Sequence, residues 1–329
     1  MKKIIHILIF VLLCFAMVEL SYRYYTSGDA AFTFGRFNSL NLLLHSGLVQ
    51  RSEYPSILYE LKPDIDALFQ DSEFKTNSAG MVDKEYSKAK PENTLRIALV
   101  GSSWTMGSGV SQDAAYHSLL ETELSAQSKD QNYEFLNFGV EHYGLREIVA
   151  TARHRAIKWD PDILVVTITP FTAKLRWDEP SPDEELPEQE YSFFKSYVLR
   201  TLDNIMGTKY YATNLASRPI IKFSDDTLYQ AQLERAFQEL HQIAAEEGIP
   251  LMVMWLSYRQ PQTETEALLK KFSAEYDVIF VDTYKWLDNA NKALLYSGRF
   301  NRHPNEYGHE LIAQSLKGSL IENNLLSGL

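Results

Sequence analysis

The sequence predicts a three-layer α/β/α domain, built on a parallel sheet, that follows an N-terminal membrane anchor. Short apolar runs typical of buried strands alternate with helical patterns along residues 94–329. Parallel neighbours need helical crossovers, so this order indicates a sheet covered by helices on both faces. We expect strands at residues 96–100, 133–138, 163–168, 250–256 and 278–281, and helices at 113–125, 145–158, 227–247, 263–276 and 305–317.

The composition fits a globular protein and argues against a nucleic-acid surface. The chain has 329 residues, of which 45% are hydrophobic and 23% are charged, and these proportions supply a full core. Its formal net charge is −11, whereas binding to nucleic-acid phosphates needs a basic patch. An acidic run at residues 178–190 carries part of this charge, and we interpret it as a solvated loop.

The first 25 residues predict a helix that lies in a membrane. Lys2 and Lys3 precede an almost wholly apolar run at residues 4–18, which contains the only cysteine, Cys14. Either a signal peptide or a signal anchor fits this pattern. No small-x-small cleavage site follows directly, and residues 21–25 are bulky and suit a membrane interface. We expect an uncleaved, single-pass anchor in the inner (cytoplasmic) membrane, with the lysines in the cytoplasm and the globular domain in the periplasm.

Two segments lie outside the alternation of strands and helices. Residues 26–93 form a lead segment without a clean period, which we expect to pack on the main domain, residues 94–329. An insertion at about residues 174–224 begins Pro-rich and acidic and then contains clustered aromatic residues. Loops of this length are often lids or binding loops. A peripheral helical excursion that packs on the domain fits equally well.

Residues 96–110 predict a strand that turns sharply into a helix. The apolar run 97–100 leads into Gly101-Ser-Ser-Trp-Thr-Met-Gly107, whose small residues allow a tight turn. Such a turn displays one side chain at the carboxyl end of the strand and directs free backbone N–H groups toward whatever binds there. We expect Ser103 in that position. A serine in a glycine-rich turn is usually only part of a turn, so this motif alone does not establish a site.

A second motif lies near the end of the chain, where a histidine precedes a predicted helix. It reads Asn301-Arg-His-Pro-Asn-Glu-Tyr-Gly-His309. Together the two motifs resemble the SGNH/GDSL hydrolase family, whose first block reads Gly-Asp-Ser-x-Thr-x-Gly. The last block of that family places an Asp two or three residues before a His, often followed by Pro-Asn and then Gly-His. The matching residues are Gly101, Ser103, Thr105 and Gly107 in the first block, and His303, Pro304, Asn305, Gly308 and His309 in the last.

The resemblance implies a flavodoxin-like, SGNH-type fold and a serine enzyme that acts on ester bonds without a metal or another cofactor. The family's nucleophile and base correspond to Ser103 and His303. Its oxyanion donors correspond to the backbone N–H groups of Ser103 and His142 and to an Asn side chain in the third block. That Asn is absent here, so Thr169 and Thr172 are the candidate side-chain donors.

The sequence departs from the family pattern at positions that carry chemistry. Ser102 replaces the Asp beside the nucleophile, and His142 stands where the second block has its oxyanion Gly. The Asp before His303 is missing, and Asn301 could orient the imidazole through its carbonyl oxygen. An amide cannot supply the negative charge that stabilises imidazolium, and losing that charge can be costly.

Two functional interpretations therefore remain open. One is a membrane-anchored esterase or O-acyltransferase that acts on acyl, in particular acetyl, esters of glycans or lipids, a substrate class that the resemblance implies. The other is a catalytically degenerate domain that binds a carbohydrate, an acyl ligand or a partner protein in the cell envelope. The intact Ser103 and His303 favour the enzyme, and the altered blocks favour the binding domain. We expect no metal, because no His/Asp/Glu cluster has ligand spacing.

Overall fold

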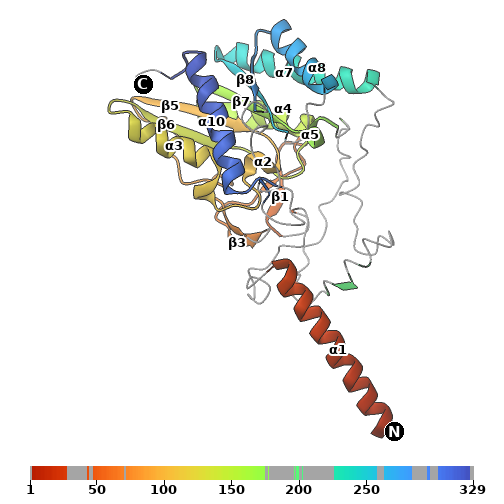
Figure 1. Cartoon of the computed structure of the whole chain (residues 1–329). Coiled ribbons are helices and arrows are strands. Elements are labelled where there is room, and N and C mark those ends of the chain that lie inside the picture. Colours follow the sequence, from red (N-terminus) through yellow and green to blue (C-terminus); the bar gives the residue numbers. More distant parts are fainter. Residues whose placement is uncertain are drawn as a thin grey trace.

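The centre of the molecule is a five-stranded sheet, seen here in a computed structural model (Figure 1). The structure describes residues 2–27, 43, 47–69, 72–174, 177, 196, 198–199, 202, 226–257, 263–283, 295–296 and 303–326. Its strands, in spatial order, are β6 (Asn132–Asn137), β5 (Thr94–Val100), β7 (Ile163–Ile168), β8 (Leu251–Trp255) and β9 (Ile279–Asp282). Every neighbouring pair is parallel. The five predicted strands and their parallel arrangement are confirmed.

The sheet is buried on both faces, because alternate residues of each strand point to opposite sides. In β5, Ile97 and Leu99 belong to one apolar cluster, whereas Ala98 and Val100 belong to the other. The helices divide in the same way: α3 (Tyr116–Gln127) and α10 (Glu306–Glu322) cover the first face, and α4 (Leu145–Thr151), α7 (Asp226–Glu247) and α8 (Thr263–Glu275) cover the second. The predicted three-layer α/β/α fold is confirmed.

Two of the predicted helices differ in detail from the structure. A short 3₁₀ turn, η3 (Gln112–Ala114), precedes α3 where one continuous helix was predicted. The predicted helix at 145–158 consists of three pieces, because α4 continues into a π-helical turn, η4 (Ala152–Ala156), and a 3₁₀ turn, η5 (Ile157–Trp159). A π-helical turn inserts a residue into the helical ladder and is frequent at functional sites.

The strand order fixes where a ligand site is expected. Strands that follow one another along the chain as β5, β6 and β7 lie in space as β6-β5-β7, so the winding reverses between β5 and β7. Open α/β sheets bind ligands beyond the carboxyl ends of their strands at such a reversal. The turn that contains Ser103 leaves β5 at this place.

The lead segment packs on the sheet domain as two antiparallel hairpins, β1 (Val49–Arg51) with β2 (Tyr59–Leu61), and β3 (Asp66–Phe69) with β4 (Ser72–Lys75). The Tyr59 phenol donates to the Glu141 carbonyl oxygen at 2.7 Å, and the Tyr143 phenol donates to the Tyr59 carbonyl oxygen at 2.6 Å. These bonds join the first hairpin to the loop after β6. The boundaries at 25/26 and 93/94 stay predictions.

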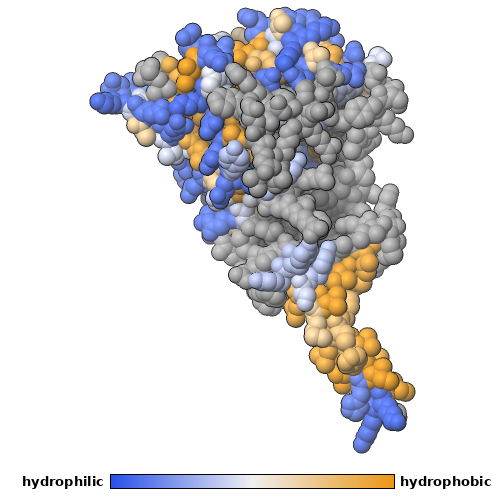
Figure 2. All heavy atoms as spheres, viewed as in Figure 1, coloured by the Kyte–Doolittle hydropathy of each residue, from blue (hydrophilic) through white to orange (hydrophobic). Residues whose placement is uncertain are grey.

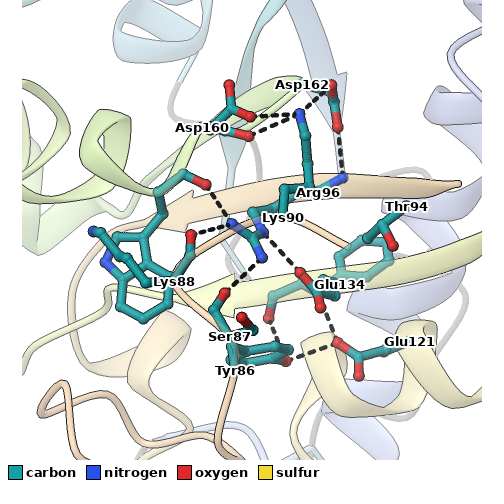
Figure 3. Close-up of polar contacts among 12 residues, drawn as sticks. Tyr86, Ser87, Lys88, Lys90, Thr94, Arg96, Glu121, Glu134, Asp160 and Asp162 are labelled. Carbon is teal, nitrogen blue, oxygen red and sulfur yellow. Dashed lines mark hydrogen bonds and ion pairs between the residues drawn. The ribbon is translucent and has the colours of Figure 1, made fainter. Parts of the chain in front are cut away.

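One arginine fastens the amino ends of the strands. Arg96 of β5 is fully buried (Figure 3). Its Nε donates to Glu134 Oε2 at 2.7 Å, and its terminal nitrogens donate to the carbonyl oxygens of Trp159, Ser87 and Lys88. A buried charge is tolerated only where it is paired and hydrogen-bonded. Arg96 meets this condition, and it thereby ties the end of the lead segment to β6 and η5.

Helix α1 (Lys2–Ser27) extends away from the globular part (Figure 1). Residues Lys2–Tyr25 contain a window with a mean hydropathy of 2.5, and apolar side chains cover much of the helix surface (Figure 2). A membrane span needs about 20 predominantly apolar residues, so α1 is long and apolar enough to cross a bilayer. A signal sequence has the same properties. Anchoring, topology and the inner-membrane location stay predictions.

Some predicted features fall on residues outside the described ranges. The acidic run 178–190 is one of them. Of the predicted insertion at 174–224, the structure describes residues 174, 177, 196, 198–199 and 202. Asn301, the predicted orienting residue, also lies outside the described ranges.

Candidate active site

The turn after β5 presents Ser103 at the start of a short helix, α2 (Ser103–Met106). Gly101 permits this turn, because a Cβ there would overlap the hydroxyls of Thr105 and Thr167, which bond to each other. The N–H groups of Thr105 and Met106 both donate to the Ser102 carbonyl oxygen, as the first bonds of the turn. The Ser103 N–H precedes them, in the position of a free helix-start donor. The predicted strand and turn are confirmed, whereas α2 was not predicted, since the predicted helix begins at Asp113.

A chain of hydroxyls holds this turn against the loop after β7. The Thr172 hydroxyl donates to Ser102 Oγ at 3.1 Å, and the Thr169 hydroxyl bonds to Thr172 Oγ1 at 2.9 Å. Thr172 N–H also donates to Thr169 Oγ1. In this arrangement the hydroxyl protons of both threonines are already donated to hydrogen bonds within the row of hydroxyls. A role for Thr169 or Thr172 as an oxyanion donor would require one hydroxyl to turn, and it stays a prediction.

The loop before α10 holds His303 next to a helix start. Asn305 caps α10, and its Oδ1 accepts from Gly308 N at 3.0 Å. The Asn305 N–H donates to the Leu295 carbonyl oxygen at 2.9 Å, and Tyr296 forms a bridge with Pro304. An Asn cap of this kind stabilises a helix start by about 1 kcal/mol. The residues that directly follow His303 are therefore fixed by the helix cap and by their contacts with Leu295 and Tyr296.

The turn after β5 and the loop before α10 meet through an apolar contact. Trp104, the residue after Ser103, packs against Leu295 and Leu311, together with Tyr296. Leu295 and Tyr296 are the same residues that bond to the His303 loop, and Leu311 lies on α10. Ser103 is thus next to Trp104 of this cluster in the sequence, and His303 is next to Pro304, which forms a bridge with Tyr296 of the same cluster.

The second block brings another histidine to this edge of the sheet. His142 follows β6, its ring is 32% exposed, and its Nδ1 lies 3.4 Å from Glu141 Oε1. It packs edge-on against Phe171, with ring centroids 5.7 Å apart. Its backbone φ is 66°, a left-handed conformation that glycine adopts at far lower cost than histidine. This agrees with the resemblance, which aligns position 142 with a glycine.

His303 and His142 are close enough to interact electrostatically. Burial and, to a smaller extent, the charge of His142 together lower the pKa of His303 to about 4. Desolvation disfavours the imidazolium form, and a like charge acts with it. At neutral pH the His303 ring is therefore neutral, which is the form that can accept a proton.

A buried polar cluster supports the site from beneath. Asn137, the last residue of β6, accepts from the Gly139 N–H at 2.9 Å and donates to the Met106 carbonyl oxygen at 3.4 Å. Its Nδ2 also lies 3.4 Å from Nδ1 of His117, whose Nε2 is 3.7 Å from Asp83 Oδ1. Burial lowers the pKa of His117 to about 3. The cluster fixes the loop after β6 against the end of α2.

His309 has a structural position in α10. Its Nδ1 accepts from the Tyr116 N–H at 3.3 Å, and its ring stacks on Tyr116 with centroids 5.9 Å apart. Burial lowers the pKa of His309 to about 3. The match of His309 to the last motif therefore reflects the packing of α10 on the start of α3.

The structure brings most of the predicted residues to one edge of the sheet. Ser103, His142, Thr169 and Thr172 follow the carboxyl ends of β5, β6 and β7, and the packing of Trp104 brings the His303 loop to them. Among the described residues, Ser103 Oγ makes no hydrogen bond, so direct contact with His303 stays a prediction. Catalytic hydrogen bonds are often long in unliganded sites.

Sequence reasoning missed Glu141, the carboxylate beside His142. Its signal was adjacency alone: an acid directly before a histidine in a loop that follows a strand. The buried Asn137 and His117 were also missed, because a helix pattern does not reveal that a polar side chain points into the core. Across the described ranges, no group of three or more His, Cys, Asp or Glu side chains could hold a metal ion.

The comparisons with known proteins concern the fold. The sequence matches no protein-family model and no curated protein. A lipolytic protein of the G-D-S-L family from Desulfitobacterium hafniense is similar in structure, with 12% identity and a TM-score of 0.42 over 68% of this chain and 99% of that one. A lipase/acylhydrolase from Enterococcus faecalis has 14% identity and a TM-score of 0.44 over 70% and 96%. An acetyl xylan esterase from Geobacillus stearothermophilus has 14% identity and a TM-score of 0.43 over 71% of this chain and 97% of that one. The solved structures to which the chain is similar thus include G-D-S-L lipolytic proteins and esterases.

Proposed function

We propose that this protein is a serine esterase or O-acyltransferase, with Ser103 as nucleophile and His303 as base. The observation that supports this proposal is the packing of Trp104, the neighbour of Ser103, against Leu295, whose carbonyl oxygen accepts from Asn305 in the loop of His303. The low pKa of His303 keeps its ring neutral at physiological pH, so the ring can accept a proton, but as a weaker base than an unperturbed imidazole.

The reaction follows from these roles. Ser103 Oγ attacks the acyl carbon and its proton passes to His303, while the carbonyl electron pair moves onto the oxygen. The N–H groups of Ser103 and His142 are the oxyanion donors. Collapse of this intermediate breaks the ester bond, and His303 returns the proton to the leaving alkoxide. Water or an acceptor hydroxyl then attacks the acyl-enzyme by the same steps, which gives hydrolysis or transfer.

The missing aspartate sets the expected rate of this enzyme. Asn301 can hold the His303 ring through its carbonyl oxygen, but it brings no negative charge to the imidazolium. In serine proteases, changing the triad Asp to Asn lowers kcat about ten-thousandfold. We therefore propose a slow enzyme, with small acyl groups, in particular acetyl, on glycans or lipids as its substrates. This substrate class rests on the motif resemblance.

We propose an extracytoplasmic location for the site. Lys2 and Lys3 precede the apolar part of α1, and lysines flanking a span stay on the cytoplasmic side. The globular part then lies in the periplasm, anchored to the inner membrane. Fractionation tests this directly: the intact chain should require detergent for release, and its recovery in the soluble periplasmic fraction would contradict the anchor.

Active-site labelling tests the enzyme itself. The full chain, purified in a neutral detergent, is treated with a fluorescent serine-directed phosphonate and assayed with short acyl nitrophenyl esters. Ser103→Ala should abolish both labelling and turnover. Ser108→Ala is the matched control, because Ser108 lies on the same segment and its buried Oγ has no hydrogen-bond partner in the described part of the chain. Labelling that persists in Ser103→Ala would contradict the assignment.

The second candidate is a catalytically degenerate domain that binds a glycan, an acyl ligand or an envelope protein. The altered motif positions favour it, as does the unbonded Ser103 Oγ among the described residues. Absence of both labelling and turnover between about pH 5 and pH 9 in a folded protein would favour this candidate.

A further inference from the structure

A cavity of about 200 Å³ lies where the lead segment meets η4 and η5. Its lining is mostly basic and aromatic, and includes Lys88, His154, Arg155, Lys158, Tyr54 and Trp159. Trp159 precedes β7, so the cavity is on the amino-terminal side of that strand, whereas Ser103 follows the carboxyl end of β5. No residue of the candidate active site lines it.

The π-helical turn shapes this cavity. His154 and Arg155 lie on η4, and Lys158 and Trp159 lie on η5. A regular helix would rotate each residue by about 100°, and the extra residue of a π turn shifts the register of those that follow. The turn thus places basic side chains from two successive pieces of one helix around the same opening.

Arg155 forms a fixed wall whose charge is already compensated. Its Nε lies 3.3 Å from Glu60 Oε2, and its NH2 donates to the Ala79 carbonyl oxygen at 2.9 Å. Both partners belong to the lead segment. The cavity therefore exists only where the lead segment is seated on the domain.

Lys88 is a cation without a carboxylate partner in the described part of the chain. Its Nζ lies 4.1 Å from the centre of the Trp159 ring. Burial lowers the pKa of Lys88, and the charges of Lys158, Arg96 and Arg155 lower it further. Arg96 and Arg155 have carboxylate partners, whereas no described residue pairs with Lys88 in this way.

Lys158 is the second cation that faces the opening. Its ammonium donates to the Tyr54 phenol and lies 4.7 Å from the centre of that ring. His154 stacks on the same tyrosine, with centroids 4.8 Å apart. The acid that acts on Lys158 is Glu53, an exposed residue of the same lining. The lining contains one other carboxylate, Glu60, which is paired with Arg155, so the exposed Glu53 is the carboxylate that faces the two lysines.

We propose that this cavity binds an oxyanion, a phosphate or a carboxylate group, with Lys88 and Lys158 as its ionic contacts. Sites for drug-sized ligands usually occupy about 300–1,000 Å³, so the cavity suits a small anion or one charged unit of a larger molecule. Lysine binds phosphate as a compact point charge. On a chain with a net charge of −11, this positive cavity is a local exception that attracts anions. The proposal is independent of the esterase assignment.

Calorimetric titration of the full chain in neutral detergent at low ionic strength tests the site. The probes are inorganic phosphate, glucuronate and, as the uncharged counterpart of glucuronate, glucose. We expect one or both anions to bind with a Kd of about 1 mM or tighter, and glucose not to bind. Phosphate binding alone indicates a phosphate group, and glucuronate binding alone indicates an acidic sugar. Binding of neither anion, or equal binding of glucose and glucuronate, would overturn the proposal.

Charge variants locate the binding. The double variant Lys88→Gln, Lys158→Gln should weaken anion binding at least tenfold. Each exposed ion pair can raise the affinity up to about fivefold, so the loss of two pairs is large enough for this effect. Lys75→Gln is the matched control, because Lys75 pairs with Glu73 outside the cavity, and it should change the Kd less than twofold. Equal affinities in the double variant and the control would overturn the proposal. Should the double variant fail to fold, Glu53→Gln decides: it should tighten binding two- to fivefold, and an unchanged Kd counts against the site.

Discussion

The two ends of the parallel strands use different chemistry. At the amino ends, Arg96 is buried and paired with Glu134, and it donates to three backbone carbonyl oxygens (Figure 3). At the carboxyl ends, the turn of Ser103 is held by hydroxyls, and the nearby ring of His303 is neutral. Permanent charge therefore stabilises one end, and groups that can gain or lose a proton gather at the other.

The difference shows how one sheet separates stability from reactivity. A buried guanidinium with all its partners locks two segments together, but it cannot take part in proton transfer because it does not deprotonate. Imidazole and hydroxyl groups bind more weakly, but imidazole changes protonation state at accessible pH and a serine hydroxyl can pass its proton to a neighbouring base. Substitutions at the amino ends of the strands should therefore affect mainly folding, and substitutions at the carboxyl ends should affect mainly turnover.

The largest effect is expected for His303→Ala, which removes the proposed base. Turnover of a nitrophenyl ester should fall by about a thousandfold or more, since Ser103 then has no group to accept its proton. Added imidazole should restore part of the rate, which a purely structural loss would not allow. Unchanged turnover in a folded variant would contradict the role of His303.

Arg96→Met should give the next largest effect, and on stability. It leaves the buried Glu134 carboxylate without its partner and removes the donors for three carbonyl oxygens, so the free energy of unfolding should fall by about 3–5 kcal/mol. Denaturant unfolding measures this. Lys90→Gln is the control: Lys90 pairs with Asp160 and Asp162 nearer the surface, and its loss should cost less than about 1 kcal/mol. Equal losses in both variants would contradict the comparison.

The pH dependence of turnover should follow the low pKa of His303. A general base works in its neutral form, so kcat/KM should be constant from neutral pH downward and fall as the pH approaches about 4. An unperturbed histidine would lose activity near pH 6.5. His142→Ala removes a like charge, so this acid limb should move to higher pH. A limb near pH 6.5 in the unchanged protein would show that His303 is not buried as described here.

The smallest effect is expected for Thr172→Val, which cuts the hydroxyl chain to Ser102. Ser102 Oγ loses the hydrogen bond that Thr172 donates, and the barrier to turnover should rise by about 1 kcal/mol. Thr172→Ser keeps the hydroxyl and should restore the rate. An equal loss in both variants would show that the threonine methyl group, and not the hydrogen bond, positions the turn.

The sequence predicted the sheet well because its strands are continuous apolar runs. Residues 163–168 are all buried, as expected for a strand covered on both faces. The break of the helix after Thr151 was not predicted, because neither glycine nor proline marks the π-helical turn. The buried role of His117 was also unpredictable, since its partners Asp83 and Asn137 come from distant parts of the chain.

The sequence by itself determined the alternation of strands and helices and the apolar N-terminal helix, and it contains the serine motif and the histidine motif as two separate local patterns. These features are local, since each depends on the spacing of residues within a few turns of the chain. Tertiary structure alone decided that Trp104 meets Leu295 and that Lys88 shares a cavity with Lys158. These residues are far apart in the sequence, and only the packing of helices, strands and loops brings them into contact.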